Sequence, residues 1–180
     1  GVPTLNMLRK AIHELVPVGM NHHDSPRTMP QRLEKLANES QSGLQIVSRE
    51  WQRAKTQIGT LGGGNHFIEL QAEDSRYDDE GVDCAGEGRL WIMIHSGSRN
   101  VGKQVCDYYH KAAVGYMERF HSKVPDKDLA FLPEGVPEHD AYLEEMRWCM
   151  AFAEESRSLM LEAVRLAILE VLGIGFKTDV

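Results

Sequence analysis

Two short segments contain the residues best suited to chemistry. In the first, Gly62-Gly63-Gly64-Asn65-His66-Phe67-Ile68-Glu69, an amide, an imidazole and a carboxylate directly follow three glycines. Successive glycines let backbone N–H groups approach an anion closely. Neutral His can ligate a metal, Asn can hydrogen-bond phosphate, and Glu can accept from hydroxyls or a nucleotide base. The alternative is an ordinary glycine-rich hairpin whose His is satisfied in the core.

The second segment is His95-Ser96-Gly97-Ser98-Arg99, at the end of an apolar run. A His where a buried strand emerges into a turn is well placed to be a ligand, and Arg99 can grip a phosphate bidentately. A compatible alternative makes Ser98 the N-cap of a following helix, with His95 hydrogen-bonded in the core.

His66 and His95 are imidazoles that suit Zn, Mn or Fe. A catalytic metal site needs at least three protein ligands, so this pair alone is incomplete. The remaining candidates lack ligand spacing; they are His22, His23, His110, His121, His139, Cys84, Cys106 and Cys149.

The first segment also poses a geometric question. In a regular strand, Asn65, Phe67 and Glu69 share one face, whereas His66 points to the other. Either the strand begins only after His66, or a bulge re-aims one side chain.

Periodicity predicts an α+β fold in which short strands carry the two motifs and helices flank them. We expect helices over 5–15, 31–38, 44–55 and 101–120, and a long helical segment over 140–172, as one helix or two stacked end to end. A strand should end near residue 70, a buried-type strand should cover 89–95, and the acidic stretch 71–88 should be a solvated loop, so the strands pair or neighbour each other. Residues 1–180 read as a single partial domain.

Composition narrows the class of protein. The chain has 180 residues, 42% hydrophobic and 26% charged, with a net charge of −7. This balance is typical of a soluble globular protein, and no apolar run is long enough for a membrane span. Bases exceed acids before residue 60 and acids exceed bases after it, which argues against non-specific nucleic-acid binding but leaves room for a local phosphate site.

Three cysteines without CxxC spacing indicate reduced thiols, and hence a cytoplasmic protein. The chain starts without methionine, so we expect it to have been processed or cut from a longer protein. The long helical segment should expose a wide apolar face, which predicts possible self-association.

Segments 61–69 and 91–99 together resemble the RtcB family of tRNA-splicing ligases. The similarity continues through Asp128-Leu129-Ala130-Phe131, Glu134-Gly135 and Tyr142-Leu143, and covers about residues 59–164. The resemblance implies a GTP- and Mn²⁺-dependent RNA ligase that joins 3′-phosphate or 2′,3′-cyclic phosphate ends to 5′-hydroxyl ends. It also implies a His–GMP and an RNA-ppG intermediate.

The resemblance implies roles for particular residues. His66 and His95 look like manganese ligands, in a family that binds two ions. Asn65, His66, Phe67, Ile68 and Glu69 look like the GTP-binding segment, and Ser98 and Arg99 look like RNA or phosphate contacts.

The departures from the family pattern limit what this chain is expected to do alone. The family's Asp-x-Gly-Cys-Gly-type metal motif is missing, and we expect a third His ligand and the guanylylated His to lie outside these residues. The isolated chain should therefore be inactive. Asn100 replaces the usual glycine and should take the left-handed conformation there.

Two alternatives remain. The chain could be a non-catalytic metal- or nucleotide-binding module derived from such a ligase. A metal-dependent phosphoesterase is supported only by histidines beside phosphate-binding turns, and is the weaker of the two.

Overall fold

The computed structural model describes residues 2–72 and 90–175. Three helices precede two consecutive strands and further helices follow them, so the predicted α+β fold is confirmed. The elements are α1 (Val2–Leu15), α2 (Gln31–Glu39), α3 (Gln45–Gln57), β1 (Phe67–Ala72), β2 (Leu90–His95), α4 (Arg99–Arg119), the short 3₁₀ helix η1 (Lys127–Leu129) and α5 (Pro137–Leu172). Most of the acidic stretch predicted to be a loop lies outside the described residues.

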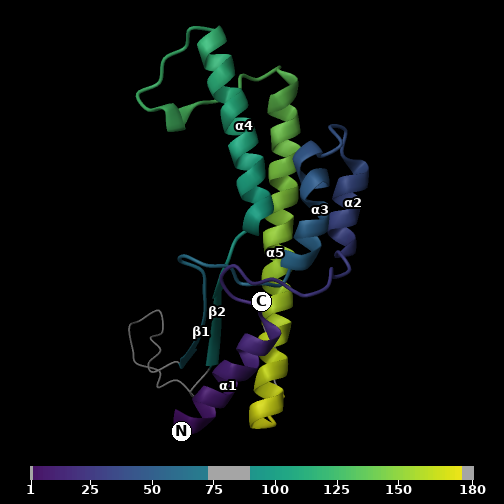
Figure 1. The fold of residues 1–180 in the computed structure, drawn as a ribbon, viewed down its shortest axis with the longest axis vertical. Coiled ribbons are helices and arrows are strands. Elements are labelled where there is room, and N and C mark those ends of the chain that lie inside the picture. Colours follow the sequence, from purple (N-terminus) through teal and green to yellow (C-terminus); the bar gives the residue numbers. More distant parts are fainter. Residues whose placement is uncertain (1, 73–89, 176–180) are drawn as a thin grey trace, which may run out of the picture.

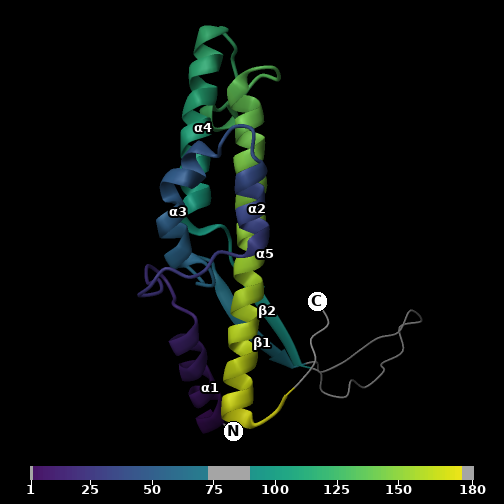
Figure 2. The same ribbon diagram turned by 90° about the vertical axis from the view of Figure 1, so that its right-hand side faces the viewer.

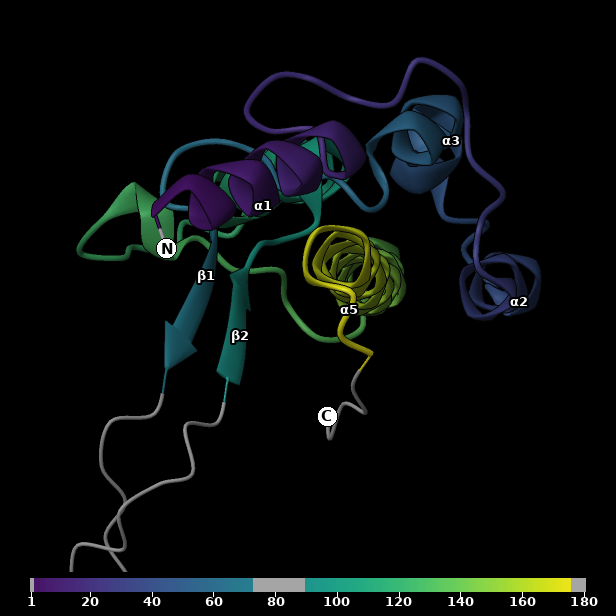
Figure 3. The same cartoon turned by 90° about the horizontal axis from the view of Figure 1, so that it is seen from below.

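Helix α5 is the longest helix of the described residues, and the other elements lie along it (Figure 1). It runs unbroken for 36 residues, so the predicted long segment is one helix and not two. Pro137 stands in its first turn, and Gly173 ends it with φ 66°, donating its N–H to Leu169 O. Helices α2, α3 and α4 lie along its N-terminal half, and α1 and the two strands lie along its C-terminal half (Figures 1 and 2). Seen from below, α1 and the strands are on one side of α5, and α2 and α3 are on the other (Figure 3).

The upper core forms around Trp148 of α5, which is fully buried. Its indole N–H donates to Leu33 O of α2 at 3.0 Å, and its ring stacks on Phe152 at 5.3 Å. Burying a large aromatic ring removes much apolar surface from water, and the hydrogen bond satisfies its one polar atom. Trp148 therefore fixes α2 against α5.

The lower core packs one face of the sheet against α1 and α5. Ile68 and Leu70 of β1 and Ile92 and Ile94 of β2 turn toward this core. The opposite face is open: Trp91 is 55% and Met93 46% exposed. The sequence-based expectation of a fully buried strand over 89–95 is thus wrong for one face, because alternating side chains place every second residue outward.

The described residues bear on three expectations from the sequence: the membrane span, the cysteines and self-association. No described helix is both long and apolar enough to cross a bilayer. Cys106 is an exposed and Cys149 a buried free thiol. Exposed apolar side chains occur along α5, at Met150, Leu166, Leu169 and Leu172. Self-association through this helix stays a prediction.

A buried carboxylate joins α5 to α3. Glu145 is fully buried and accepts from the backbone N–H groups of Ile46 (2.9 and 3.1 Å) and Val47 (2.8 Å), at the start of α3. The Tyr109 hydroxyl donates to it at 3.2 Å. A carboxylate at a helix N-terminus satisfies free N–H donors and complements the helix dipole. Glu145 thus holds α3, α4 and α5 together at one point.

We expect Glu145→Ala to lower the free energy of unfolding by about 3 kcal/mol, because it leaves buried N–H donors without an acceptor. Urea denaturation measures the change. Glu170→Ala removes an exposed carboxylate from the same helix and should leave stability nearly unchanged. Equal losses in the two variants would contradict this role for Glu145.

Candidate functional site

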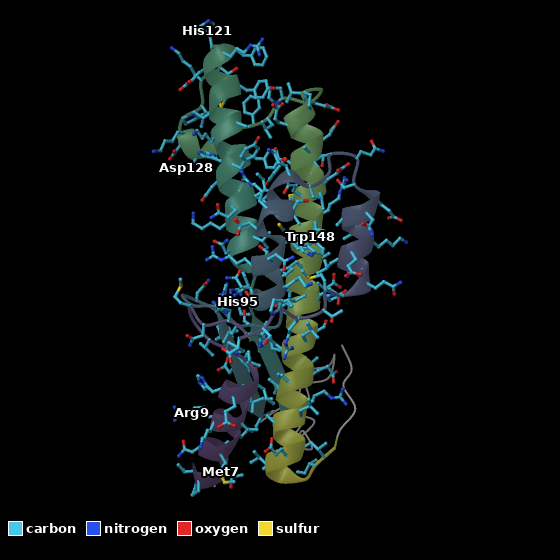
Figure 4. The ribbon with its side chains drawn as sticks, turned by 45° about the vertical axis from the view of Figure 1, so that its right-hand side comes forward. Met7, Arg9, His95, His121, Asp128 and Trp148 are labelled. Atoms are coloured by element: carbon cyan, nitrogen blue, oxygen red, sulfur yellow. The ribbon has the colours of Figure 1, made fainter. Side chains whose placement is uncertain are left out.

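Strand pairing brings the two predicted motifs together. β1 and β2 are antiparallel, and Phe67 lies opposite His95. β1 begins at Phe67, so His66 stands just before the strand; of the two arrangements expected from the sequence, a strand that begins after His66 is confirmed. His95, the last residue of β2, is on the open face of the sheet, and not in the core. His66 and His95 therefore meet at one end of the sheet. Figure 4 shows His95 near the middle of the long axis of the molecule.

The geometry of the two imidazoles suits a shared cation. Their ring centroids are 6.0 Å apart and the planes are tilted by 57°. A metal–nitrogen bond of about 2.0–2.1 Å puts an imidazole centroid about 3 Å from the ion, so rings about 6 Å apart can ligate the same ion. The Asn65 amide nitrogen lies 3.5 Å from His95 Nε2, at the outer limit of a hydrogen bond. This nitrogen of His95 therefore faces the Asn65 side of the site.

The position of His66 depends on Gly62. His66 Nδ1 is buried and has no hydrogen-bond partner among the described residues. It lies against Gly62, where an added Cβ would collide with both His66 Nδ1 and Arg99 Nη1. Buried polar atoms are normally paired, so hydrogen bonding alone does not explain where this ring sits. The ring is held at this position by its packing against Gly62, beside the Arg99 guanidinium.

Arg99 connects the turn before α4 to the loops that contain Thr60 and Gly19. Its Nε donates to Thr60 Oγ1 at 3.0 Å and its Nη2 donates to Gly19 O at 3.0 Å. The backbone joins the same loops, because Gly19 N–H donates to Gly62 O at 2.7 Å. Burial of the guanidinium, and secondarily the charge of Arg53, lower the pKa of Arg99. Two of its three nitrogens are thus committed to the fold, and only Nη1 remains beside Gly62.

The turn before α4 differs from expectation in two ways. Ser98 stands at the N-cap position of α4, as predicted, but its side chain makes no capping hydrogen bond; it lies instead over Gly102. The left-handed residue is Arg99, with φ 56°, and not Asn100, whose side chain donates to Glu50 at 2.8 Å. A non-glycine residue with positive φ costs about 1 kcal/mol or more and persists only where contacts over-determine it. The Arg99 hydrogen bonds do so here.

The predicted GTP-binding segment divides between two faces of β1. Phe67 is 40% exposed and stacks on His95, with centroids 5.4 Å apart and an interplanar angle of 18°. Glu69 is on the same open face and accepts from Gln71 at 3.2 Å. Ile68 packs on the opposite face, in the lower core. A nucleotide on the open face would contact Ile68 only through its main chain.

Two further cations, Arg53 and Arg157, lie beside residues of the site, and a third, Arg27, lies near Gly59; nothing in the motif spacing indicated them. Arg53 is close enough to Arg99 to lower its pKa, and the Arg27 guanidinium would lie 3.7 Å from a Cβ at Gly59. Neither arginine forms an ion pair within residues 2–72 and 90–175. Arg157 of α5 donates to Ser96 O at 3.1 Å and so anchors the turn after His95. The only sequence signal was the basic surplus before residue 60.

His66 and His95 have no third ligand-type side chain grouped with them in the described part of the chain. There, no group of three or more His, Cys, Asp or Glu side chains could hold a metal. Cys84 lies outside the described residues. Within the described residues the site therefore consists of two neighbouring imidazoles with arginine side chains nearby, and the assignment of His66 and His95 as metal ligands stays a prediction.

Comparison with known proteins identifies the family. The family model described as tRNA-splicing ligase RtcB matches residues 2–179. The RNA-splicing ligase RtcB of Mycobacterium tuberculosis is 38% identical over 130 residues, which is 71% of this chain and 30% of that protein. The Escherichia coli K12 RNA-splicing ligase RtcB is 31% identical over 172 residues, 89% of this chain and 39% of the relative. The tRNA-splicing ligase RtcB of Methanopyrus kandleri is 32% identical over 163 residues, 86% of this chain and 16% of the relative.

The family model matches nearly the whole of this α+β unit, including the strand end where the two histidines meet. The chain therefore belongs to the RtcB family. It spans well under half the length of these relatives.

We expect Gly62→Ala to destabilise the chain more than Gly64→Ala. Both glycines have positive φ, which costs alanine about 1 kcal/mol, but a Cβ at Gly64 meets open space. At Gly62 the Cβ must displace His66 and Arg99, which adds about 2 kcal/mol. Urea denaturation of both variants gives the difference directly, and equal losses would show that Gly62 does not shape the site.

Proposed function

We propose that this chain forms part of the active centre of an RNA ligase that uses GTP and Mn²⁺. One observation carries the proposal: His66 and His95, from the two segments that resemble the RtcB family pattern, lie 6.0 Å apart between ring centroids. The relatives bear the names RNA-splicing or tRNA-splicing ligase. Arg53, which forms no ion pair with any described residue, lies near Arg99 and supports a polyanionic substrate.

The reaction proposed transfers GMP from GTP to a histidine, with release of pyrophosphate. GMP then passes to the RNA 3′-phosphate, and the 5′-hydroxyl of the second RNA attacks that phosphate, forming the phosphodiester and releasing GMP. A 2′,3′-cyclic phosphate must first be opened by water. Bound Mn²⁺ would neutralise charge on the triphosphate and the RNA phosphate.

The residues of this chain would bind and orient in that reaction. His66 and His95 would hold a cation through their free ring nitrogens, and Asn65 would face phosphate through its amide. Phe67, already stacked on His95, would wall the nucleotide on the open face. Ser98 and Arg99 lie where a phosphate could approach the N-terminus of α4. We expect the histidine that receives GMP to lie outside the described residues.

The test is ligation by the complete gene product, using RNA halves with 2′,3′-cyclic phosphate and 5′-hydroxyl ends, GTP and Mn²⁺. His66→Ala and His95→Ala should each lower the ligation rate more than about 100-fold, because each removes a direct cation ligand. His121→Ala is the matched control: His121 lies at the far end of α4 (Figure 4), about 30 Å along the helix from Arg99. Wild-type ligation by both site variants would refute the assignment.

A second function is supported by the described residues, which hold two imidazoles and no larger ligand cluster. A metal- or nucleotide-binding module would bind Mn²⁺ or GTP through His66 and His95 without joining RNA. Binding with no ligated product from the complete gene product would favour this module over the ligase.

A further inference from the structure

A groove between α2 and α5 carries charges that the reaction proposed above does not use. Its volume is about 510 Å³, and its lining includes Arg32 and Leu36 of α2, and Arg147, Met150, Glu154 and Arg157 of α5. Three of its polar side chains are thus guanidinium groups and one is a carboxylate. In a chain with a net charge of −7, this is a local excess of positive charge.

The arginines differ in how far they are committed to the fold. Arg32 donates to Glu154 at 2.7 Å and lies 3.8 Å from Glu155. Arg157 donates a single hydrogen bond, to Ser96 O, which leaves donors of its fork free. Arg147 is exposed and makes no hydrogen bond or ion pair with any described residue. Two cations of the groove are therefore available to an anion.

The spacing of these cations suits a linear polyanion. Arg147 and Arg157 are ten positions apart on one helix, which corresponds to about 15 Å along its axis. Two cations this far apart on one helix can contact different phosphates of the same strand, because every nucleotide carries one negative charge. Guanidinium forks match phosphate bidentately.

One lining residue of the groove, Arg157, also contacts the candidate active site. Arg157 contacts the carbonyl of Ser96, the residue that follows His95. A strand lying in the groove would therefore reach the turn that carries the second imidazole. A protein partner fits less well, because none of the described residues lining the groove is aromatic, whereas protein interfaces favour Trp and Tyr anchors.

We propose that the α2–α5 groove binds the phosphate backbone of single-stranded RNA and leads it toward the His66–His95 site. The proposal rests on the proposed ligase function for the identity of the anion. Leu36 and Met150 contribute apolar lining, and Arg147 and Arg157 contact phosphates. Glu154 opposes binding by its own charge and by neutralising Arg32.

The experiment measures binding of a fluorescent single-stranded RNA to this chain by anisotropy, without GTP or Mn²⁺, across about 50 to 200 mM salt. Arg147→Gln should reduce the salt slope by about 0.7 and weaken binding about fivefold near 0.1 M salt, the loss of one phosphate contact. Lys123→Gln removes an exposed cation from the loop after α4 and should change neither.

Glu154→Gln should have the opposite effect on RNA affinity. It should tighten binding, because it removes a negative charge from the groove and the carboxylate to which Arg32 donates. Circular dichroism confirms that each variant is folded. No RNA binding by the wild type, or equal affinities for Arg147→Gln, Glu154→Gln and Lys123→Gln, would overturn the proposal.

The same variants separate this proposal from the ligase function. Binding that depends on Arg147, in a complete gene product that joins no RNA, would support the groove and refute the ligase. Ligation with the RNA KM unchanged by Arg147→Gln would support the ligase and refute the groove.

Discussion

The pairing of β1 with β2 is the constraint on which the site depends. A register that places Phe67 opposite His95 also brings His66 to the same end of the sheet. Shifting that register by one residue would turn His95 away and expose Ile92 and Ile94, which pack in the lower core. A two-stranded sheet is marginal in water, so the packing of its inner face on α1 and α5 is what secures the histidine pair.

Helix α5 connects this site to the rest of the molecule. Glu145, Trp148 and Arg157 project from one helix to α3, α2 and the turn after His95. Because each contact joins segments far apart in sequence, the geometry of the site is set by tertiary packing and not by the motifs alone. The basic groove lies along the same helix and would link substrate binding to the His95 turn.

Periodicity was sufficient to predict the main helices and the two strands, and motif spacing was sufficient to single out His66 and His95, which the structure brings together. The strand start after His66 and the unbroken α5 were alternatives that spacing left open, since both depend on local packing. The open face of β2 was missed, because an apolar run such as Leu90–Ile94 has the same composition whether one or both faces are covered. The left-handed conformation of Arg99 and the contact of Arg157 with Ser96 could not be predicted. Both depend on hydrogen bonds between residues 60 or more positions apart, Arg99 with Gly19 and Arg157 with Ser96, and no sequence pattern pairs these segments.

The central claim is that His66 and His95 ligate one cation together. Titrating Mn²⁺ into this chain, and following the free-ion signal by electron paramagnetic resonance, tests it most directly. In a double-mutant cycle, His66→Ala and His95→Ala should each weaken binding about tenfold or more, and the double variant should be little worse than either single one. Independent, additive losses, or binding unaffected by both substitutions, would contradict a shared site.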